Sequence, residues 1–194
     1  MKKIPTLFVR EFENHRVIKV TDQVTKGLEW VLNGEGEATI KIDGSCCAII
    51  DGKLYKRYDA KKGKTPPAGA IPCCDPDPIT GHWPHWVLVD ENNPSNKWFV
   101  KAFEEISNRG VYLKDGTYEA IGIHFNGNPY NLEYDDLVPH GTAIVYGLTR
   151  TFEGIKNYLS KNEIEGIVFW KDGEPQCKIK RSDFGFEWPI TREI

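Results

Sequence analysis

An Asp-Gly pair at positions 51–52 is the feature that most limits how this chain can fold. It lies between the β-rich runs CCAII and KLYKRY, and that arrangement is the strongest short-range signal for a two-residue type I′ hairpin. With the pair as the loop, Ile50 faces Lys53, and Cys46 faces Arg57. The hairpin therefore returns Arg57 to the place where its first strand begins.

The rest of the chain predicts an α+β fold with mainly antiparallel sheets. Apolar residues recur at helical spacing in two segments, one capped by Ser95 and ending before Gly110, the other covering 151–160. A Pro- and Trp-rich insertion is expected at about 59–97, and its residues 63–96 read as loop. Further strands are expected at 117–125, 142–148, 165–170 and 176–180. A second Asp-Gly turn joins the last two of these strands.

The composition is that of an ordinary globular protein. Of 194 residues, 40% are hydrophobic and 27% charged, and we expect one domain spanning 1–194. No apolar run reaches the roughly 18–20 residues of a membrane span, and the first residues lack a secretory signal, so a cytoplasmic location is expected. The formal net charge of −3 argues against a general polyanion-coating protein.

Basic residues are concentrated between Lys53 and Lys64, where six of twelve residues are basic and the one acid is Asp59. A charge run of this kind is usually a solvated loop. It also fits a local phosphate-binding stripe, because anion affinity depends on the local field more than on net charge. Both interpretations stay open. The six residues are Lys53, Lys56, Arg57, Lys61, Lys62 and Lys64.

The five cysteines, an odd number without a signal peptide, indicate reduced thiols. Cys46 and Cys47 are neighbours in a predicted strand, so their side chains point to opposite faces and cannot easily bind one metal ion. A second group has residue types that bind zinc, but its spacing does not match the usual C-x₂₋₄-C arrangement. That group is Cys73, Cys74, His82 and His85.

Charged residues in the predicted strands form a second pattern. Lys178 and Lys180 are two residues apart, so both point to one face, and a bound anion is a natural reason to keep two ammonium groups together. Glu165 begins the preceding strand on the face of Ile167, and Glu119 lies in another strand. Taken singly, each charge is more simply explained as a solvent-facing or strand-end residue.

The order of these motifs resembles the covalent nucleotidyltransferase superfamily, which comprises ATP-dependent DNA ligases, RNA ligases and mRNA-capping enzymes. KIDG at 41–44 looks like the nucleotidyl-lysine motif, and YKR at 55–57 looks like the arginine element that follows it. YEAIG, EGIVF and CKIK look like the three later motifs, in the expected order. Five motifs in one order distinguish this resemblance from a chance K-x-D-G match.

Further segments resemble a family of compact 5′-to-3′ RNA ligases, RNA ligase 1-like, found in animals, bacteria and phages. These segments are GAIP…DPDPITGHWP, YEAIG…NGNPYNL and LVPHG, and the resemblance runs from about Gly34 to Arg181. His85 departs from it, since a glycine is expected after Trp-Pro. The resemblance implies an adenylyltransferase (ATP-grasp-like) domain of antiparallel sheets flanked by helices, without an OB-fold.

The resemblance also implies roles for individual residues. Lys41 would be the nucleophile that attacks the α-phosphorus of ATP and carries AMP. Lys178 would contact the α-phosphate, and Lys180 would orient the leaving pyrophosphate. Glu165 would hold a hydrated Mg²⁺ ion, with Mn²⁺ as a possible substitute, and Asp43 is a second candidate metal ligand.

Other residues would bind the nucleoside and the RNA. Glu119 would bind the ribose hydroxyls, and Arg57 the ribose or an incoming 5′-phosphate. Tyr146 and His140 are candidates for stacking on adenine, and Ile40 flanks the lysine in the nucleotide site. RNA phosphates would contact Arg57, Lys56, Lys61, Lys62 and Lys64.

The implied activity is an ATP-dependent RNA ligase whose partner is RNA with a 5′-phosphate and a 3′-hydroxyl end. AMP would move from the lysine to the 5′-phosphate, and the 3′-hydroxyl would then displace it. A DNA ligase and a capping-type guanylyltransferase are alternatives that use the same lysine chemistry. A nucleic-acid-binding protein with a decayed site is a third alternative.

Overall fold

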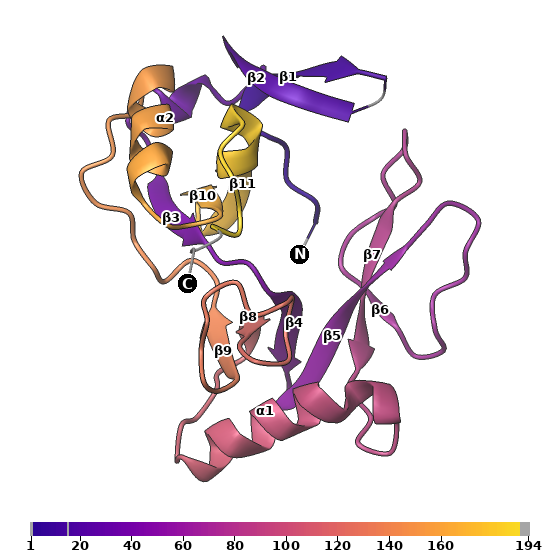
Figure 1. Ribbon diagram of the computed structural model, residues 1–194. Helices are drawn as coiled ribbons and strands as arrows, with labels where there is room; N and C mark the ends of the chain where they lie inside the picture. The colour runs from indigo at the N-terminus through magenta and orange to yellow at the C-terminus, as the bar shows by residue number, and fades with distance from the viewer. Residues whose placement is uncertain (1, 15, 191–194) are drawn as a thin grey trace. The chain divides into compact units, whose positions relative to one another are not determined.

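Antiparallel strand pairing dominates the computed structural model, which describes residues 2–14 and 16–190 (Figure 1). The chain divides into two compact units. Unit 1 consists mainly of Asp43–His140, and unit 2 consists of Ile4–Ile42 with Gly141–Ile194. The predicted α+β fold with mainly antiparallel sheets is confirmed. A single nucleotidyltransferase domain over the whole chain stays a prediction.

Unit 2 contains a three-stranded antiparallel sheet in the order β11–β10–β3. Two of these strands are joined by the predicted second Asp-Gly turn, in which Asp172 and Gly173 have φ angles of 54° and 75°. The strands of the sheet are β3 (Glu37–Lys41), β10 (Gly166–Lys171) and β11 (Glu174–Lys180). The remaining elements are β1 (Phe8–Glu13), β2 (Arg16–Val24), α2 (Phe152–Lys161) and the 3₁₀ turns η1 (Glu29–Val31) and η3 (Arg181–Phe184).

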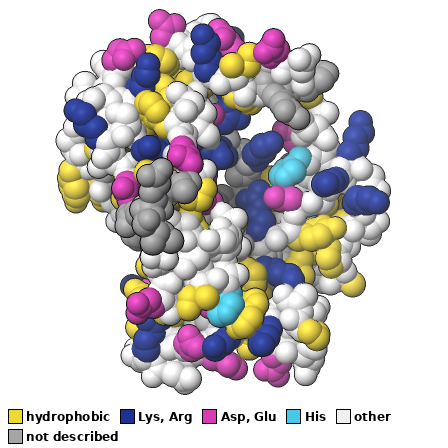
Figure 2. All heavy atoms as spheres, in the orientation of Figure 1, with side chains coloured by type: hydrophobic (Ala, Val, Ile, Leu, Met, Phe, Trp, Pro, Cys, Tyr) yellow, Lys and Arg dark blue, Asp and Glu magenta, His cyan; other side chains and the backbone are white. Residues whose placement is uncertain are grey.

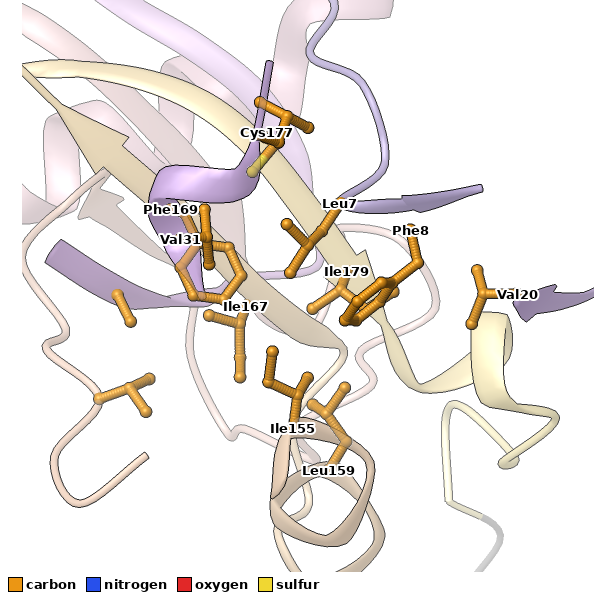
Figure 3. Close-up of a cluster of buried hydrophobic side chains, with 13 residues drawn as sticks. Leu7, Phe8, Val20, Val31, Ile155, Leu159, Ile167, Phe169, Cys177 and Ile179 are labelled. Carbon is orange, nitrogen blue, oxygen red and sulfur yellow. The ribbon is translucent and has the colours of Figure 1, made fainter. Parts of the chain in front are cut away.

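The core of unit 2 lies between this sheet and helix α2. Alternation along the strands places Ile167 and Ile179 on the same face, opposite each other in register. Ile155 and Leu159 of α2 point toward this face in Figure 3, and all four side chains are fully buried. Thr151 caps the helix by accepting a hydrogen bond from Gly154 N–H, as the predicted helix start requires.

Both edges of the unit 2 sheet are covered by extended chain. Beside β3, the Ile40 N–H donates to Ala143 O, and the single bridge Thr39–Ile144 replaces the predicted strand 142–148. Glycines at 141 and 147 have φ angles of 76° and 68°, so extended backbone cannot continue through them, and the longer strand prediction is wrong. Beside β11, residues 5–7 make two hydrogen bonds to the backbone of Lys178.

Unit 1 contains a six-stranded sheet in the order β6–β7–β5–β4–β8–β9. The hairpin of β4 and β5 has the predicted loop, since Asp51 and Gly52 have φ angles of 51° and 69°, and Ile50 pairs with Lys53. The strands are β4 (Ser45–Ile50), β5 (Lys53–Ala60), β6 (Ile71–Pro72), β7 (Trp83–Leu88), β8 (Gly116–Ile121) and β9 (Asp136–Pro139).

Helix α1 (Lys97–Asn108) packs against one face of the unit 1 sheet through Ala102 and Ile106. The predicted apolar face is confirmed, but the predicted cap is wrong. The 3₁₀ turn η2 (Pro94–Asn96) precedes the helix, and the side chain of Asn93, rather than Ser95, accepts the capping hydrogen bond.

Two other expectations for unit 1 are wrong. The insertion 63–96 is not all loop, because β7 pairs with β5 along its whole length. Pro84 and His85 hide the β-pattern of WPHWVL, so hydrophobic periodicity did not reveal this strand. Strand β8 ends at Ile121 rather than at residue 125, because Gly122 has a φ of 124° and turns the chain.

Neither helix of the described chain has the length and apolar content needed to cross a membrane.

Candidate functional site

Three lysines share the face of the unit 2 sheet that is opposite the hydrophobic core. Lys41 and Lys180 are both paired with Gly166, from the two sides of β10. Lys178 lies two residues before Lys180 and therefore points to the same face, as predicted. The side chain of Ile40 packs against the core on the other face, and its part in nucleotide binding stays a prediction.

Gly166 makes this arrangement possible. A Cβ atom at this position would lie 2.3 Å from the backbone oxygen of Ile179 and 2.9 Å from the Cα of Lys180, much closer than van der Waals contact. A glycine therefore lets β10 and β11 approach each other and leaves the space between Lys41 and Lys180 open. The glycine of the EGIVF motif has a steric role here.

Glu165 occupies that space. Its side chain is nearly buried, with the residue 5% exposed. Lys41 Nζ donates to one carboxylate oxygen, Oε2, at 2.5 Å, and Lys180 Nζ lies 3.2 Å from the other, Oε1. The prediction that Glu165 shares the face of Ile167 is wrong, because Glu165 precedes the first residue of β10 and strand alternation does not extend to it.

The cluster of three lysines and one glutamate carries excess positive charge. Burial, followed by repulsion from Lys41, Lys180 and Arg10, lowers the pKa of Lys178 to about 8. Arg10 is itself neutralised by Asp183, whose Oδ1 lies 2.7 Å from its Nη2. Three ammonium groups thus face one carboxylate, and an anion such as a phosphate would relieve the repulsion.

The lowered pKa predicts how anion binding depends on pH. In the free protein the Lys178 ammonium is mostly charged at pH 7 and mostly neutral at pH 9, so the affinity for a fully ionised anion should fall as pH rises through 8. Sulfate titrated calorimetrically should bind about tenfold more weakly at pH 9 than at pH 7. The Lys178→Gln variant should not show this loss of sulfate affinity between pH 7 and pH 9. An equal loss in the variant would show that a group other than Lys178 causes the pH dependence.

The residues fit a magnesium ion only in part. Mg²⁺ in proteins is commonly held by one or two carboxylates together with substrate phosphates and water. Glu165 offers one such carboxylate, although both of its oxygens face ammonium groups. Phosphate oxygens of a nucleotide would therefore have to supply the other ligands.

A second group of expected site residues lies on one face of the unit 1 sheet. Glu119 of β8 and Cys46 of β4 are paired in register, and the pairing of Cys47 with Lys56 brings Arg57 of β5 beside Cys46, as the hairpin prediction required. His140 Nε2 lies 2.8 Å from Glu119 Oε2, and His140 Nδ1 lies 3.0 Å from Thr117 Oγ1. The imidazole of His140 is therefore fixed at both nitrogens.

Arg57 and Lys56 have separate environments. They are neighbours in β5, so their side chains point to opposite faces of the sheet. Arg57 Nε donates to Asp59 Oδ1 at 2.9 Å, whereas Lys56 Nζ donates to the buried Asn96 at 2.6 Å, on the side of α1. Lys56 thus has a structural partner at the start of the helix.

The other lysines of the basic run are exposed: Lys53, which begins β5, and Lys61, Lys62 and Lys64, which follow it. Figure 2 shows dark-blue Lys and Arg side chains at several places on one face of the molecule. Their exposure leaves both earlier interpretations open, a solvated loop and a phosphate-binding stripe.

Asp43 and Tyr146 complete the set of expected residues. Asn126 Nδ2 donates to Asp43 Oδ1 at 2.8 Å, and the Asp43 N–H donates to Tyr130 Oη at 2.7 Å. Tyr146, in unit 2, is 80% exposed, so its ring is accessible for stacking. Asn126 and Tyr130 were not predicted as site residues, although both lie in the NGNPYNL segment.

The possible zinc group of cysteines and histidines is not brought together. Among the described residues, the group close enough to hold a metal ion is Cys46, Glu119 and His140. His85 is buried and its Nδ1 contacts the backbone oxygen of Trp83. The expected site residues are thus divided between the units: Lys41, Glu165, Lys178 and Lys180 cluster in unit 2, whereas Asp43, Arg57, Glu119 and His140 belong to unit 1.

Sequence comparisons show an RNA-ligase-like relationship. The chain is 25% identical to a protein named RNA ligase 1 from Pongo abelii and 27% identical to one from Rattus norvegicus, each match covering 97% of this chain and 82% of the relative. A third, from Danio rerio, is 28% identical over 57% of this chain and 43% of the relative. No protein-family model matches the chain.

Proposed function

We propose that this chain, an RNA-ligase-like protein by its sequence relationship, is an ATP-dependent RNA ligase that carries AMP on Lys41. The observation that carries the proposal is the contact of Lys41 with Glu165 in a cluster that also contains Lys178 and Lys180. The similarity to proteins named RNA ligase 1 supports RNA as the substrate.

The first step requires Lys41 to lose its proton. Glu165 Oε2, at 2.5 Å, is in position to accept the proton, and the positive charges of Lys178 and Lys180 favour its loss. The lone pair of Lys41 Nζ then forms a bond to the α-phosphorus of ATP. The bond from that phosphorus to the bridging oxygen breaks, and pyrophosphate leaves with the electron pair.

Positive charge around Lys41 would assist this step. Charge grows on the phosphate oxygens as the nitrogen attacks, so catalysis depends mainly on positioning and electrostatic stabilisation. Lys178 would neutralise the α-phosphate and Lys180 the leaving pyrophosphate. A Mg²⁺ ion held by Glu165 and phosphate oxygens would supply further charge neutralisation.

Residues of unit 1 would bind the rest of the nucleotide and the RNA. Glu119 would accept hydrogen bonds from the ribose hydroxyls, with His140 holding its carboxylate in place. Arg57 would bind the ribose or the 5′-phosphate of RNA. In the second step that phosphate attacks Lys41-bound AMP and frees the lysine. In the third, a 3′-hydroxyl attacks the activated 5′-phosphate and AMP leaves.

A joining assay tests this function. The protein is incubated with Mg²⁺, ATP and RNA that has 5′-phosphate and 3′-hydroxyl ends, beside a DNA of the same sequence. We expect AMP attached to the protein and joined RNA, with DNA joined more slowly or not at all. Joining of DNA alone would favour a DNA ligase, and protein labelling from GTP alone would favour a capping-type enzyme. No labelling from any nucleotide would contradict the lysine chemistry.

A further inference from the structure

Three strands of unit 1 bring together residue types that are common ligands of transition metals. Cys46 of β4 and Glu119 of β8 are directly paired and so point to the same face, and His140 follows the last residue of β9. The sulfur, carboxylate and imidazole atoms that could bind a metal all lie within 4.8 Å of one another. These three residues are separated by up to 94 positions in the sequence, so only the fold assembles them.

The imidazole is oriented as a metal ligand would be. In metal sites, the ring nitrogen that does not bind the metal usually donates to an oxygen, which fixes the tautomer and the ring plane. Thr117 Oγ1 lies 3.0 Å from His140 Nδ1, and the His140 N–H also donates to Thr117 O. In the metal-free protein Nε2–H donates to Glu119 Oε2 at 2.8 Å. A cation shared by His140 and Glu119 would replace that proton, and the tautomer with the proton on Nδ1 would then donate to Thr117 Oγ1.

The charges of the trio also favour a cation. As a metal ligand Cys46 would be a thiolate, and the paired Glu119 is a carboxylate, so the two would place negative charges side by side. A divalent cation between them compensates both charges, and a coordinated thiol loses its proton. Arg57, which contacts Cys46, opposes the cation, but Arg57 is also neutralised by Asp59 at 2.9 Å.

We propose that Cys46, Glu119 and His140 bind a thiophilic divalent cation of the Zn²⁺ class, with a fourth position open to water or a ligand. A sulfur and an imidazole ligand select Zn²⁺ or Co²⁺ over Mg²⁺, which prefers oxygen. Because Glu119 is proposed to bind ribose, Zn²⁺ in this site would compete with ATP, a consequence that rests on the proposed function.

Cobalt binding tests the site without using activity. Reduced, chelator-treated protein titrated with Co²⁺ should develop a sulfur-to-cobalt charge-transfer band and visible bands of tetrahedral cobalt, and Zn²⁺ should remove both. The Cys46→Ser variant should lose the charge-transfer band. The Thr117→Val variant should keep it but bind Co²⁺ roughly tenfold more weakly, since only the orientation of His140 is lost.

Controls separate this site from the other thiols. Cys73→Ser and Cys74→Ser variants should bind Co²⁺ like the unaltered protein. Absence of the band, or its loss in the Cys73 or Cys74 variants rather than in Cys46→Ser, would overturn the proposal. Circular dichroism of each variant shows whether it is folded, and a folded Cys46→Ser protein that keeps the band also overturns it.

A second measurement links the site to the proposed function. Zn²⁺ should reduce AMP attachment in the unaltered protein, and the ratio of attachment with and without Zn²⁺ should approach one in Cys46→Ser. A cobalt band without AMP attachment would overturn the proposed function alone. AMP attachment without a cobalt band would overturn the metal site alone.

Discussion

Replacing Lys41 with alanine should abolish covalent attachment of AMP, with a loss of at least about three orders of magnitude. The side chain supplies the attacking nitrogen in the proposed mechanism, and no other described lysine contacts Glu165 Oε2. The measurement is radioactive labelling of the protein by α-labelled ATP. Lys41→Arg should be equally inactive although it keeps a positive charge beside Glu165, because a guanidinium stays protonated and cannot attack.

A matched control comes from β10 in the same unit. Lys171 donates to Glu35 at 2.8 Å, both side chains are more than a third exposed, and an ion pair of this kind contributes less than about 1 kcal/mol. Lys171→Ala should therefore label like the unaltered protein. Labelling that survives in Lys41→Ala would show that the nucleophile is another residue.

Replacing Glu165 with glutamine should lower both activity and stability. The nearly buried carboxylate holds Lys41 and Lys180, and its loss leaves three ammonium groups without compensating charge. Because the lysines are partly exposed, the cost should be about 2 kcal/mol, below the roughly 3–5 kcal/mol of a fully buried pair. We expect Tm to fall by about 4–8 °C and AMP attachment by about 100-fold.

An anion should partly restore the stability of this variant. Sulfate at moderate concentration replaces the missing negative charge, so it should raise the Tm of Glu165→Gln more than that of the unaltered protein. Glu174→Gln, an exposed change at the start of β11, serves as the control. If both variants respond equally to sulfate, the carboxylate does not balance the lysine cluster.

Local signals in the sequence predicted those parts of the fold that depend on neighbouring residues. The Asp51-Gly52 turn fixes the register of β4 and β5, and alternation in CKIK fixes the shared face of two lysines. Helix α2 was identified because its apolar residues follow the helical period, and the structure adds the cap at Thr151.

Other features depend on contacts between distant segments. The short edge segment at 143–145 and strand β7 exist because β3 and β5 offer unpaired backbone groups, which no local pattern records. Lys56 and Arg57 are neighbours in β5, so strand alternation predicts that their side chains point to opposite faces of the sheet. The prediction that both contact RNA considered only their positive charge. The hydrogen bond of Lys56 to Asn96 depends on α1 and is invisible in the sequence.

Strand edges that lack partners are where β-sheet proteins associate with one another. In unit 2, backbone groups at the outer edge of β3 bond to residues 143–145, and those of Lys178 in β11 bond to residues 5–7 of the same chain. These segments would hinder another copy from extending this sheet at those positions. In unit 1, by contrast, the outermost strands are only two and four residues long. Short edges of this size limit strand addition to the unit 1 sheet, so copies of the chain should not associate by extending it.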